Sequence, residues 1–262
     1  MANVNSNERV WSEYDWSKRG DEWSRGWGGP DYHWWTMLYP RVREFLPTGT
    51  VVEIAPGYGR WTQYLLPFCE RLIGVDVAAN CVEACRERFA GVSHASFEKN
   101  DGLTLNAVGD GEVDFALSMD SLVHCDGAIV QAYVGELARK LSADGVAFLH
   151  HSNLEHYVDP ATGELPFENL TWRGKSMSAR LFGEYCREAG LLCIGQELVR
   201  WAKRQDFYSD CFSMLTRPES RFARDNQVIE NYDYPEQGAA MAKVAGFYGA
   251  AAFPGADVTS TS

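Results

Sequence analysis

Side chains that can bind a hydroxyl group and move its proton are closely spaced in the segment SMDSLVH, residues 118–124. Asp120 and His124 are four positions apart, so one helical turn would bring the two side chains to the same face. A carboxylate and an imidazole on one face are suited to general acid–base chemistry. We therefore treat Asp120 and His124 as candidate catalytic residues.

Two adjacent imidazoles follow in FLHHSNLEHY, residues 148–157. Neighbouring side chains of a strand point to opposite faces of the sheet, so one of His150 and His151 should face the site. We expect His151 to do so and count it among the candidate catalytic residues. With Asp120 and His124 it could also bind a divalent metal, but no HxxxH or HExxH spacing indicates a preformed site. We therefore predict no metal ligands and keep a divalent metal as the alternative that is not favoured.

A short glycine turn lies in VVEIAPGYGRWTQYLL, residues 51–66, between a β-branched run and a helix-like pattern. At such a turn, backbone N–H groups approach a ligand closely at the start of a helix. The GxGxxG fingerprint of dinucleotide-binding proteins would need glycine at Ala55, Gly57 and Arg60, and only the middle position has it. A nicotinamide-dependent oxidoreductase is therefore disfavoured, although it remains an alternative class of enzyme.

An acidic residue follows the glycine turn at a distance that suits binding of a ribose. Asp76 ends the next strand-like run, 23 positions after Glu53 (76 − 53), close to the roughly 20-residue offset of such sites. Its two oxygens can accept hydrogen bonds from a vicinal diol. The alternative is that Asp76 only caps the helix expected from residue 79.

Taken in order, these features resemble the motifs of class I S-adenosylmethionine-dependent methyltransferases over roughly residues 48–216. An acidic-x-small-x-Gly-x-Gly pattern spans residues 53–59, an Asp-Gly pair is at 101–102, and DFALSMDSLVHCD at 114–126 resembles the fourth motif. The resemblance implies S-adenosylmethionine as the cofactor. The cofactor-binding residues that it implies are Glu53, Ala55, Gly57, Gly59, Arg60, Asp76, Val77, Asp101, Gly102, Ser118, Met119 and Asp120.

The resemblance also implies roles for particular residues. In the family, an acidic side chain after the third strand binds the adenine amino group, which implies this role for Asp101; an exposed turn aspartate is the alternative. The Ser-x-Asp-x-x-x-His pattern of residues 118–124 resembles small phosphobase methyltransferases, in which the acid and the histidine lie at the acceptor site. This second resemblance again falls on Asp120 and His124.

Strand-like and helix-like segments alternate through the middle of the chain, which predicts an α/β fold with a Rossmann-like, doubly wound, mostly parallel sheet. We expect strands at 50–55, 71–76, about 94–98, 113–119 and 145–151, and helices at 59–69, 79–89 and 127–142. After a loop at about 153–175, a helix that ends at Gly190 precedes strands near 191–200 and 207–216, which should form an antiparallel carboxyl-terminal edge. The predicted domains are an amino-terminal lid at 1–47, a methyltransferase domain at 48–217 and a carboxyl-terminal extension at 218–262.

The segment before the first expected strand holds six of the nine tryptophans. Aromatic rings can stack on a sugar, cover a sulfonium through cation–π attraction and exclude water. We predict that this segment is an aromatic lid; an ordinary packed helix with an oligomer contact is the alternative. The expected substrate-binding residues are Trp27, Tyr32 and Trp35 of this segment, with Arg173 and Lys175 from a basic group that would suit a phosphorylated acceptor.

The composition excludes some classes of partner. The formal net charge is −12 over 262 residues, which argues against a nucleic-acid-binding surface. No apolar run approaches the roughly 18 residues of a membrane span, and the seven scattered cysteines include no CxxC pair. We therefore expect a cytoplasmic protein with reduced thiols, with a small-molecule acceptor as its partner and with homo-oligomer formation left open.

Pieces of the amino-terminal segment, together with WRGKSMS and RWAKRQDFYSDCFS, resemble a subset of bacterial methyltransferases associated with cell-surface polysaccharide or secondary-metabolite sugars. With the predictions above, this resemblance implies O-methylation of a small hydroxylated acceptor, most of all a sugar or a sugar nucleotide. N-methylation of a small amine is the alternative activity. A protein that binds the cofactor without catalysing a reaction is the alternative outside enzymes.

Overall fold

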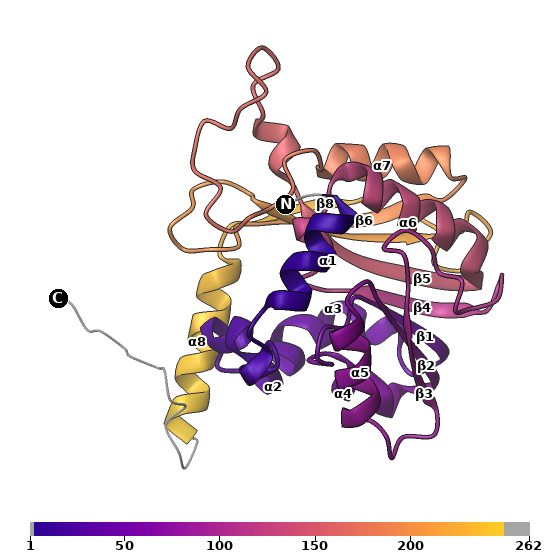
Figure 1. The fold of residues 1–262 in the computed structure, drawn as a ribbon. Helices are drawn as coiled ribbons and strands as arrows, with labels where there is room; N and C mark the ends of the chain where they lie inside the picture. The colour runs from indigo at the N-terminus through magenta and orange to yellow at the C-terminus, as the bar shows by residue number, and fades with distance from the viewer. Residues whose placement is uncertain (1–2, 249–262) are drawn as a thin grey trace.

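The computed structural model describes residues 3–248, so residues 249–262 of the predicted carboxyl-terminal extension lie outside the described residues. Within the described part of the chain, the strands form one sheet in the order β3-β2-β1-β4-β5-β7-β6-β8 (Figure 1). The strands are β1 (Thr48–Ile54), β2 (Cys69–Asp76), β3 (Ala95–Lys99), β4 (Val113–Ser118), β5 (Leu141–Ser152), β6 (Leu192–Val199), β7 (Asp210–Thr216) and β8 (Val228–Asn231).

Strands β1 to β5 are parallel to one another, whereas β7 pairs antiparallel with both β5 and β6. The predicted α/β class, with a mostly parallel Rossmann-like sheet and an antiparallel carboxyl-terminal edge, is confirmed. The extension adds one strand to this edge, because β8 pairs with β6 in parallel. Strand β1 lies between β2 and β4, so the chain leaves β1 and β4 toward opposite sides of the sheet. A crevice at the carboxyl ends of these strands is the usual ligand site of such a sheet.

Side chains alternate between two buried clusters, one on each face of the sheet. Val51 packs in one cluster and Val52 in the other, as expected for a strand that is covered on both faces. The cluster of Val52 includes side chains of α6 (Gly127–Lys140) and α7 (Ala179–Glu188), which lie side by side in Figure 1. The opposite cluster includes side chains of α4 (Thr62–Leu65), α5 (Ala79–Arg88) and α8 (Tyr234–Tyr248).

The helix expected at 59–69 is shorter than predicted. Helix α4 covers Thr62–Leu65, continues as the 3-10 turn η5 (Leu66–Phe68), and β2 already begins at Cys69. Pro67 lies within η5 and has no backbone N–H to donate to the preceding turn, which explains the early end. Strand β5 likewise begins at Leu141 rather than 145, directly after α6.

The amino-terminal segment is folded into short helices: α1 (Val4–Glu13), η1 (Trp16–Lys18), η2 (Asp21–Trp27), α2 (Pro30–Tyr32), η3 (His33–Leu38), α3 (Tyr39–Val42) and η4 (Arg43–Phe45). Helix α1 begins with an N-cap, since the Asn3 side chain accepts a hydrogen bond from the Ser6 amide at 3.0 Å. The later part of the segment is core, because Trp34 is fully buried in the same cluster as Val51. The earlier part lies beside the ends of β1, β2 and β4, where its side chains line a cavity.

Candidate active site

The glycine turn after β1 adopts left-handed backbone conformations that favour glycine. Gly57 and Gly59 have φ angles of 58° and 78°, and Ala55 has 57° although it carries a side chain. A Cβ atom at Gly57 would lie 2.9 Å from the indole of Trp16, whereas one at Gly59 would lie 2.5 Å from the ring of Phe89. Gly57 therefore borders the cavity, while Gly59 allows close packing with the core.

Two buried carboxyl groups flank this turn. Asp76, at the end of β2, accepts hydrogen bonds from the amides of Gly57 at 3.1 Å and Ala78 at 2.9 Å. Burial raises the pKa of Asp76 to about 6, and these hydrogen bonds oppose the increase. Glu53 accepts a hydrogen bond from Thr62 Oγ1 at 2.5 Å, and burial raises its pKa to about 7. Asp76 lines the cavity, whereas Glu53 does not and is hydrogen-bonded to Thr62 of α4.

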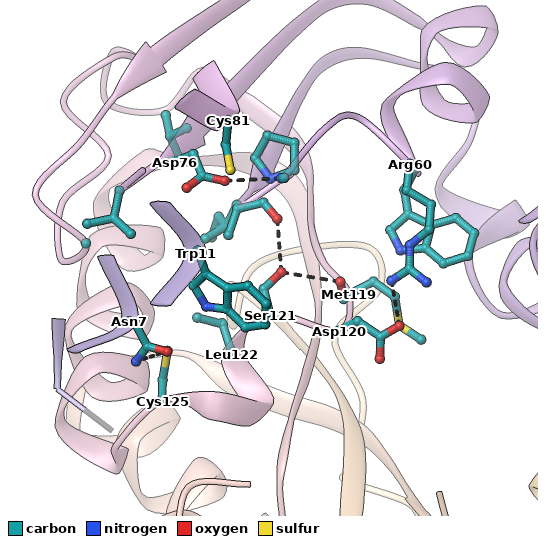
Figure 2. Close-up of a pocket in the computed structure, with 18 of the residues that line it drawn as sticks. Asn7, Trp11, Arg60, Asp76, Cys81, Met119, Asp120, Ser121, Leu122 and Cys125 are labelled. Atoms are coloured by element: carbon teal, nitrogen blue, oxygen red, sulfur yellow. Dashed lines mark hydrogen bonds and ion pairs between the residues drawn. The ribbon is translucent and has the colours of Figure 1, made fainter. Parts of the chain in front are cut away.

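A cavity of about 80 Å³ lies at the carboxyl ends of β1, β2 and β4. Figure 2 shows Asn7 near one end, Arg60 and Asp120 at the other, and Asp76 along the wall. Of the predicted cofactor-binding residues, the cavity is lined by Ala55, Gly57, Arg60, Asp76, Val77, Gly102, Met119 and Asp120. Glu53, Gly59, Asp101 and Ser118 are not among the described residues that line it.

The side chain of Asp101 is not directed into the cavity as predicted. Its Oδ1 accepts hydrogen bonds from the amides of Leu103 at 2.9 Å and Thr104 at 2.8 Å, and from the Thr104 hydroxyl at 2.9 Å. Asp101 is exposed and lines a separate hollow on the surface. The alternative, a turn aspartate, therefore describes Asp101, because local amides compete for its oxygen.

Asp120 follows β4 and has a φ angle of 63°, which turns its carboxylate toward the cavity. Its Oδ2 lies 2.6 Å from Arg60 Nη2, and both side chains are nearly buried. Burial, the largest single effect, would raise the pKa of Asp120, but the Arg60 guanidinium and the other positively charged neighbours, such as Arg173, together outweigh it and hold the pKa below its ordinary value. Arg60 also donates to Ser24 Oγ at 3.1 Å and lies over the ring of Trp61. The cavity thus contains an anchored carboxylate–guanidinium pair.

The expectation that His151 faces the site is wrong, because His150 is the imidazole next to Asp120. The Asp120 amide donates to His150 Nδ1 at 3.2 Å, so this nitrogen is the acceptor and Nε2 carries the proton that is shared with Asp210 at 2.9 Å. His151 points to the other face, where it stacks on Phe182 and Nε2 lies 2.8 Å from Ser213 Oγ.

His124 is not on one face with Asp120. Residues Leu122–His124 form the 3-10 turn η6, and Asp120 precedes it in a left-handed conformation, so the four-residue spacing does not produce an α-helical face. His124 Nδ1 lies 3.1 Å from the carbonyl oxygen of Trp172, so Nδ1 carries a proton and Nε2 is left with its lone pair. Burial lowers the pKa of His124 to about 4. The imidazole is therefore neutral and lies behind Trp11, with ring centroids 5.3 Å apart.

The amino-terminal residues that line the cavity differ from those predicted to bind substrate. Trp27 stacks on His33 in the core, and Trp35 is half exposed beside Tyr39; neither of them, nor Tyr32, is among the described lining residues. The lining residues from this segment, which the sequence analysis missed, are Val4, Asn7, Trp11, Trp16, Arg19 and Trp23. The clustering of tryptophans before residue 47 indicated the segment but not which rings face inward.

The predicted basic residues are also away from the cavity. Arg173 is buried and binds Asp210 through Nε at 3.1 Å and Nη2 at 2.7 Å. Lys175 is exposed, with Glu164 Oε2 at 3.1 Å. Each charge is therefore used in an ion pair, and Arg173 supports the carboxylate that holds His150.

Residues 3–248 contain no group of three or more His, Cys, Asp or Glu side chains arranged to bind a metal ion. In the same residues, no helix is long and apolar enough to cross a membrane.

Comparison with known proteins agrees with this geometry. Residues 51–145 match the family model of a methyltransferase domain. The structure is similar to an S-adenosylmethionine-dependent methyltransferase from Clostridium acetobutylicum, with 13% identity and a TM-score of 0.55 over 81% of this chain and 98% of that chain. It is also similar to the DhpI–SAH complex, with 15% identity and a TM-score of 0.52 over 82% and 94% of the two chains.

A further similar structure is the methyltransferase in the Haloferax volcanii complex with the Trm112 methyltransferase activator, with 20% identity and a TM-score of 0.54 over 76% and 97% of the two chains. No curated protein matches the chain. Residues 51–145 thus match a methyltransferase domain, and the fold is shared with S-adenosylmethionine-dependent methyltransferases, which makes S-adenosylmethionine the cofactor to compare with the cavity.

The residue types that line the cavity are suited to binding S-adenosylmethionine. Gly57 leaves space that a Cβ would fill, and Asp76 offers a buried acceptor for ribose hydroxyls. The volume of about 80 Å³ is below the roughly 300–1,000 Å³ of pockets that enclose drug-sized ligands. Trp16, which lies against Gly57, occupies part of this space, so we expect α1 and η1 to move outward when the cofactor enters.

Proposed function

We propose that this methyltransferase transfers the methyl group of S-adenosylmethionine to a hydroxyl oxygen of a small acceptor, a sugar or a sugar nucleotide. The observation that carries the proposal is the Asp120–Arg60 pair, which borders a cavity walled by Trp11, Trp16 and Trp23. Indole rings stack on the C–H faces of sugars, and a carboxylate beside a guanidinium offers an acceptor and donors to neighbouring hydroxyls. This combination supports a polyhydroxylated acceptor.

The chain's own residues have distinct roles in this proposal. S-adenosylmethionine, when bound, supplies an electrophilic methyl group on a sulfonium. Asp76 accepts hydrogen bonds from the ribose, and Gly57 lets the backbone approach the cofactor. Asp120 accepts a hydrogen bond from the attacking hydroxyl and orients its oxygen, while the amino-terminal tryptophans exclude water. Positioning of this kind supplies most of the catalysis in an in-line displacement.

The proton of the hydroxyl needs an acceptor, and His124 is our candidate. Its imidazole is neutral, and Nδ1–H is fixed by the Trp172 carbonyl, which leaves Nε2 as a base. His124 itself does not line the cavity, but its ring contacts Trp11, which does. We therefore infer that His124 accepts the proton only after α1 has shifted, whereas Asp120 already borders the cavity.

N-methylation of a small amine is the second candidate, and one observation favours it. Asp120 stays ionised because its pKa is held below the ordinary value, and an anion beside indole rings can also bind an ammonium group. An ammonium, however, would compete with Arg60 for the same carboxylate.

A labelled cofactor distinguishes the two candidates. The enzyme is incubated with S-[methyl-13C]adenosylmethionine and matched acceptors, a sugar nucleotide and its amino-sugar counterpart, and the products are examined by 13C NMR. The proposal predicts a methoxy carbon, formed with both acceptors. A methylamine carbon formed only with the amino sugar would contradict O-methylation and support the second candidate, N-methylation.

A further inference from the structure

Asn7 of α1 is a buried amide at the end of the cavity opposite Asp120 (Figure 2). The residue is 5% exposed, and its side-chain Oδ1 has no hydrogen-bond partner among the described residues. A buried acceptor without a donor is costly, by an amount comparable to a lost hydrogen bond. Because Asn7 is also one of the residues that line the cavity, a ligand that enters there is a source for the missing donor.

The orientation of this amide is fixed by its surroundings. Nδ2 lies 3.2 Å from the carbonyl oxygen of Asn3 and 3.4 Å from that of His124. Both neighbours can only accept hydrogen bonds, so the NH2 group must face them and Oδ1 must be the free atom. Asn7 thus offers one acceptor to a ligand, held in place by two backbone carbonyls.

The lining of the cavity also includes apolar residues that could contact a flat ring, namely Val4, Val77, Leu122 and Ile129, and Gly102. A Cβ at Gly102 would lie 2.8 Å from Val4 Cγ1, so glycine allows α1 to come this close to the loop after β3. Val77 directly follows Asp76, the acidic residue at the end of β2, so a ring held against Val77 would be adjacent to a ribose bound by Asp76.

We propose that Asn7 Oδ1 accepts a hydrogen bond from the exocyclic amino group of the cofactor's adenine. This inference rests on the cofactor site described above. Asp101, which the sequence resemblance implied for this role, has its Oδ1 occupied by the amides of Leu103 and Thr104 and faces away from the cavity. The adenine-selective group is then supplied by the amino-terminal helix, so the element that covers the cavity also selects the base.

The test compares the dissociation constants of S-adenosylhomocysteine and S-inosylhomocysteine, measured by calorimetry on the full chain. Inosine replaces the amino donor with a carbonyl oxygen, which would face Asn7 Oδ1 as a second acceptor. We expect the unmodified protein to bind S-inosylhomocysteine about 10- to 100-fold more weakly, because a site built around one hydrogen bond rejects the analogue that lacks its donor. In N7L, which is similar in size but has no acceptor, the ratio of the two constants should fall to about threefold or less.

The matched control is D101N, which should leave the ratio unchanged. Equal binding of the two ligands by the unmodified protein overturns the proposal even if N7L does not fold. Loss of discrimination in D101N, or full discrimination in a folded N7L, also overturns it. Failure of the unmodified protein to bind S-adenosylhomocysteine at all would instead contradict the cofactor site itself.

Discussion

Arg60 Nη2 lies 2.6 Å from Asp120 Oδ2, and the two side chains form a nearly buried ion pair at one end of the cavity. Because the pair joins the glycine turn after β1 to the end of β4, it connects the proposed cofactor side of the site to the proposed acceptor side. Arg60 also contacts the amino-terminal segment through Ser24 and Trp23. The ion pair is thus the point at which the sheet and the aromatic segment meet.

Replacement of Arg60 by methionine should raise the pKa of Asp120, since burial is no longer opposed by the guanidinium. In the unmodified protein the pKa of Asp120 is lower in the folded state than its value of about 3.9 in the unfolded chain. Ionised Asp120 therefore stabilises the fold at pH values above about 3.9, and this stability is lost as the pH falls through the lower pKa of the folded state. R60M should therefore move the acidic limb of the kcat/KM profile to higher pH. It should also lose about 3–5 kcal/mol of stability, the usual cost of breaking a buried pair.

The matched control is R41M, which breaks the ion pair between Arg41 Nη2 and Glu197 Oε1, 2.6 Å apart. Neither residue of this pair lines the cavity. R41M should lose stability without moving the pH profile. An unshifted profile in folded R60M would mean that Asp120 is not the group whose ionisation supports turnover.

Replacement of His150 by alanine should lower kcat while the affinity for S-adenosylhomocysteine stays nearly constant. His150 accepts a hydrogen bond from the Asp120 amide and donates to Asp210, so it positions Asp120 without bordering the cavity. H151A is the control, because His151 lies on the opposite face and should affect stability by about 1–3 kcal/mol through its bond to Ser213. Equal losses of kcat in the two variants, at equal stability, would assign His150 to packing alone.

Replacement of His124 by alanine should lower kcat by roughly 10²–10⁴-fold, the usual contribution of a general base. Cofactor affinity should change little, because His124 does not line the cavity. H94A serves as the control, since His94 is exposed. Near-normal turnover in H124A would remove the proposed base and favour an amine acceptor, which reacts as a neutral nucleophile.

Alanine at Gly57 and alanine at Gly59 should have separable effects. Both positions are left-handed, so both variants carry a backbone strain of about 1–2 kcal/mol. The new methyl group of G57A meets Trp16 in the cavity and should weaken cofactor binding, whereas that of G59A meets Phe89 in the core and should mainly reduce the free energy of unfolding. Denaturant titration and calorimetry on both variants measure the two effects, and weaker cofactor binding by G59A than by G57A would contradict this assignment.

The sheet could be predicted from the sequence because its signals are local. Continuous apolar runs such as VVEI and LIGVD identified β1 and β2, and the glycine turn and Asp76 do line a cavity at the ends of these strands. The same reasoning failed at 59–69, because Pro67 and the early start of β2 shorten the helix.

The acceptor side could not be predicted because it depends on contacts between distant segments. Which of two adjacent histidines faces Asp120 is set by the register of β5, and His150 is fixed there by Asp210 from β7. Sequence spacing placed His124 on a helix with Asp120, but a left-handed residue breaks that helix before it starts. Asn7 and the inward-facing tryptophans come from a segment whose packing has no periodic pattern to reveal it.

Calorimetric titration of S-adenosylhomocysteine as a function of pH tests the central claim most directly, that the cavity beside Asp76 is the cofactor site. Burial raises the pKa of Asp76 to about 6, so in the unliganded protein its contribution to stability is present at low pH and lost as the pH rises through about 6. Ribose hydroxyls donate to the carboxylate and favour its ionised form, so affinity should increase as the pH rises from 5 to 7 with a midpoint near pH 6. D76N should bind about 10- to 100-fold more weakly at pH 7 and should lose this pH dependence. Unchanged affinity and an unchanged pH profile in folded D76N would contradict the account.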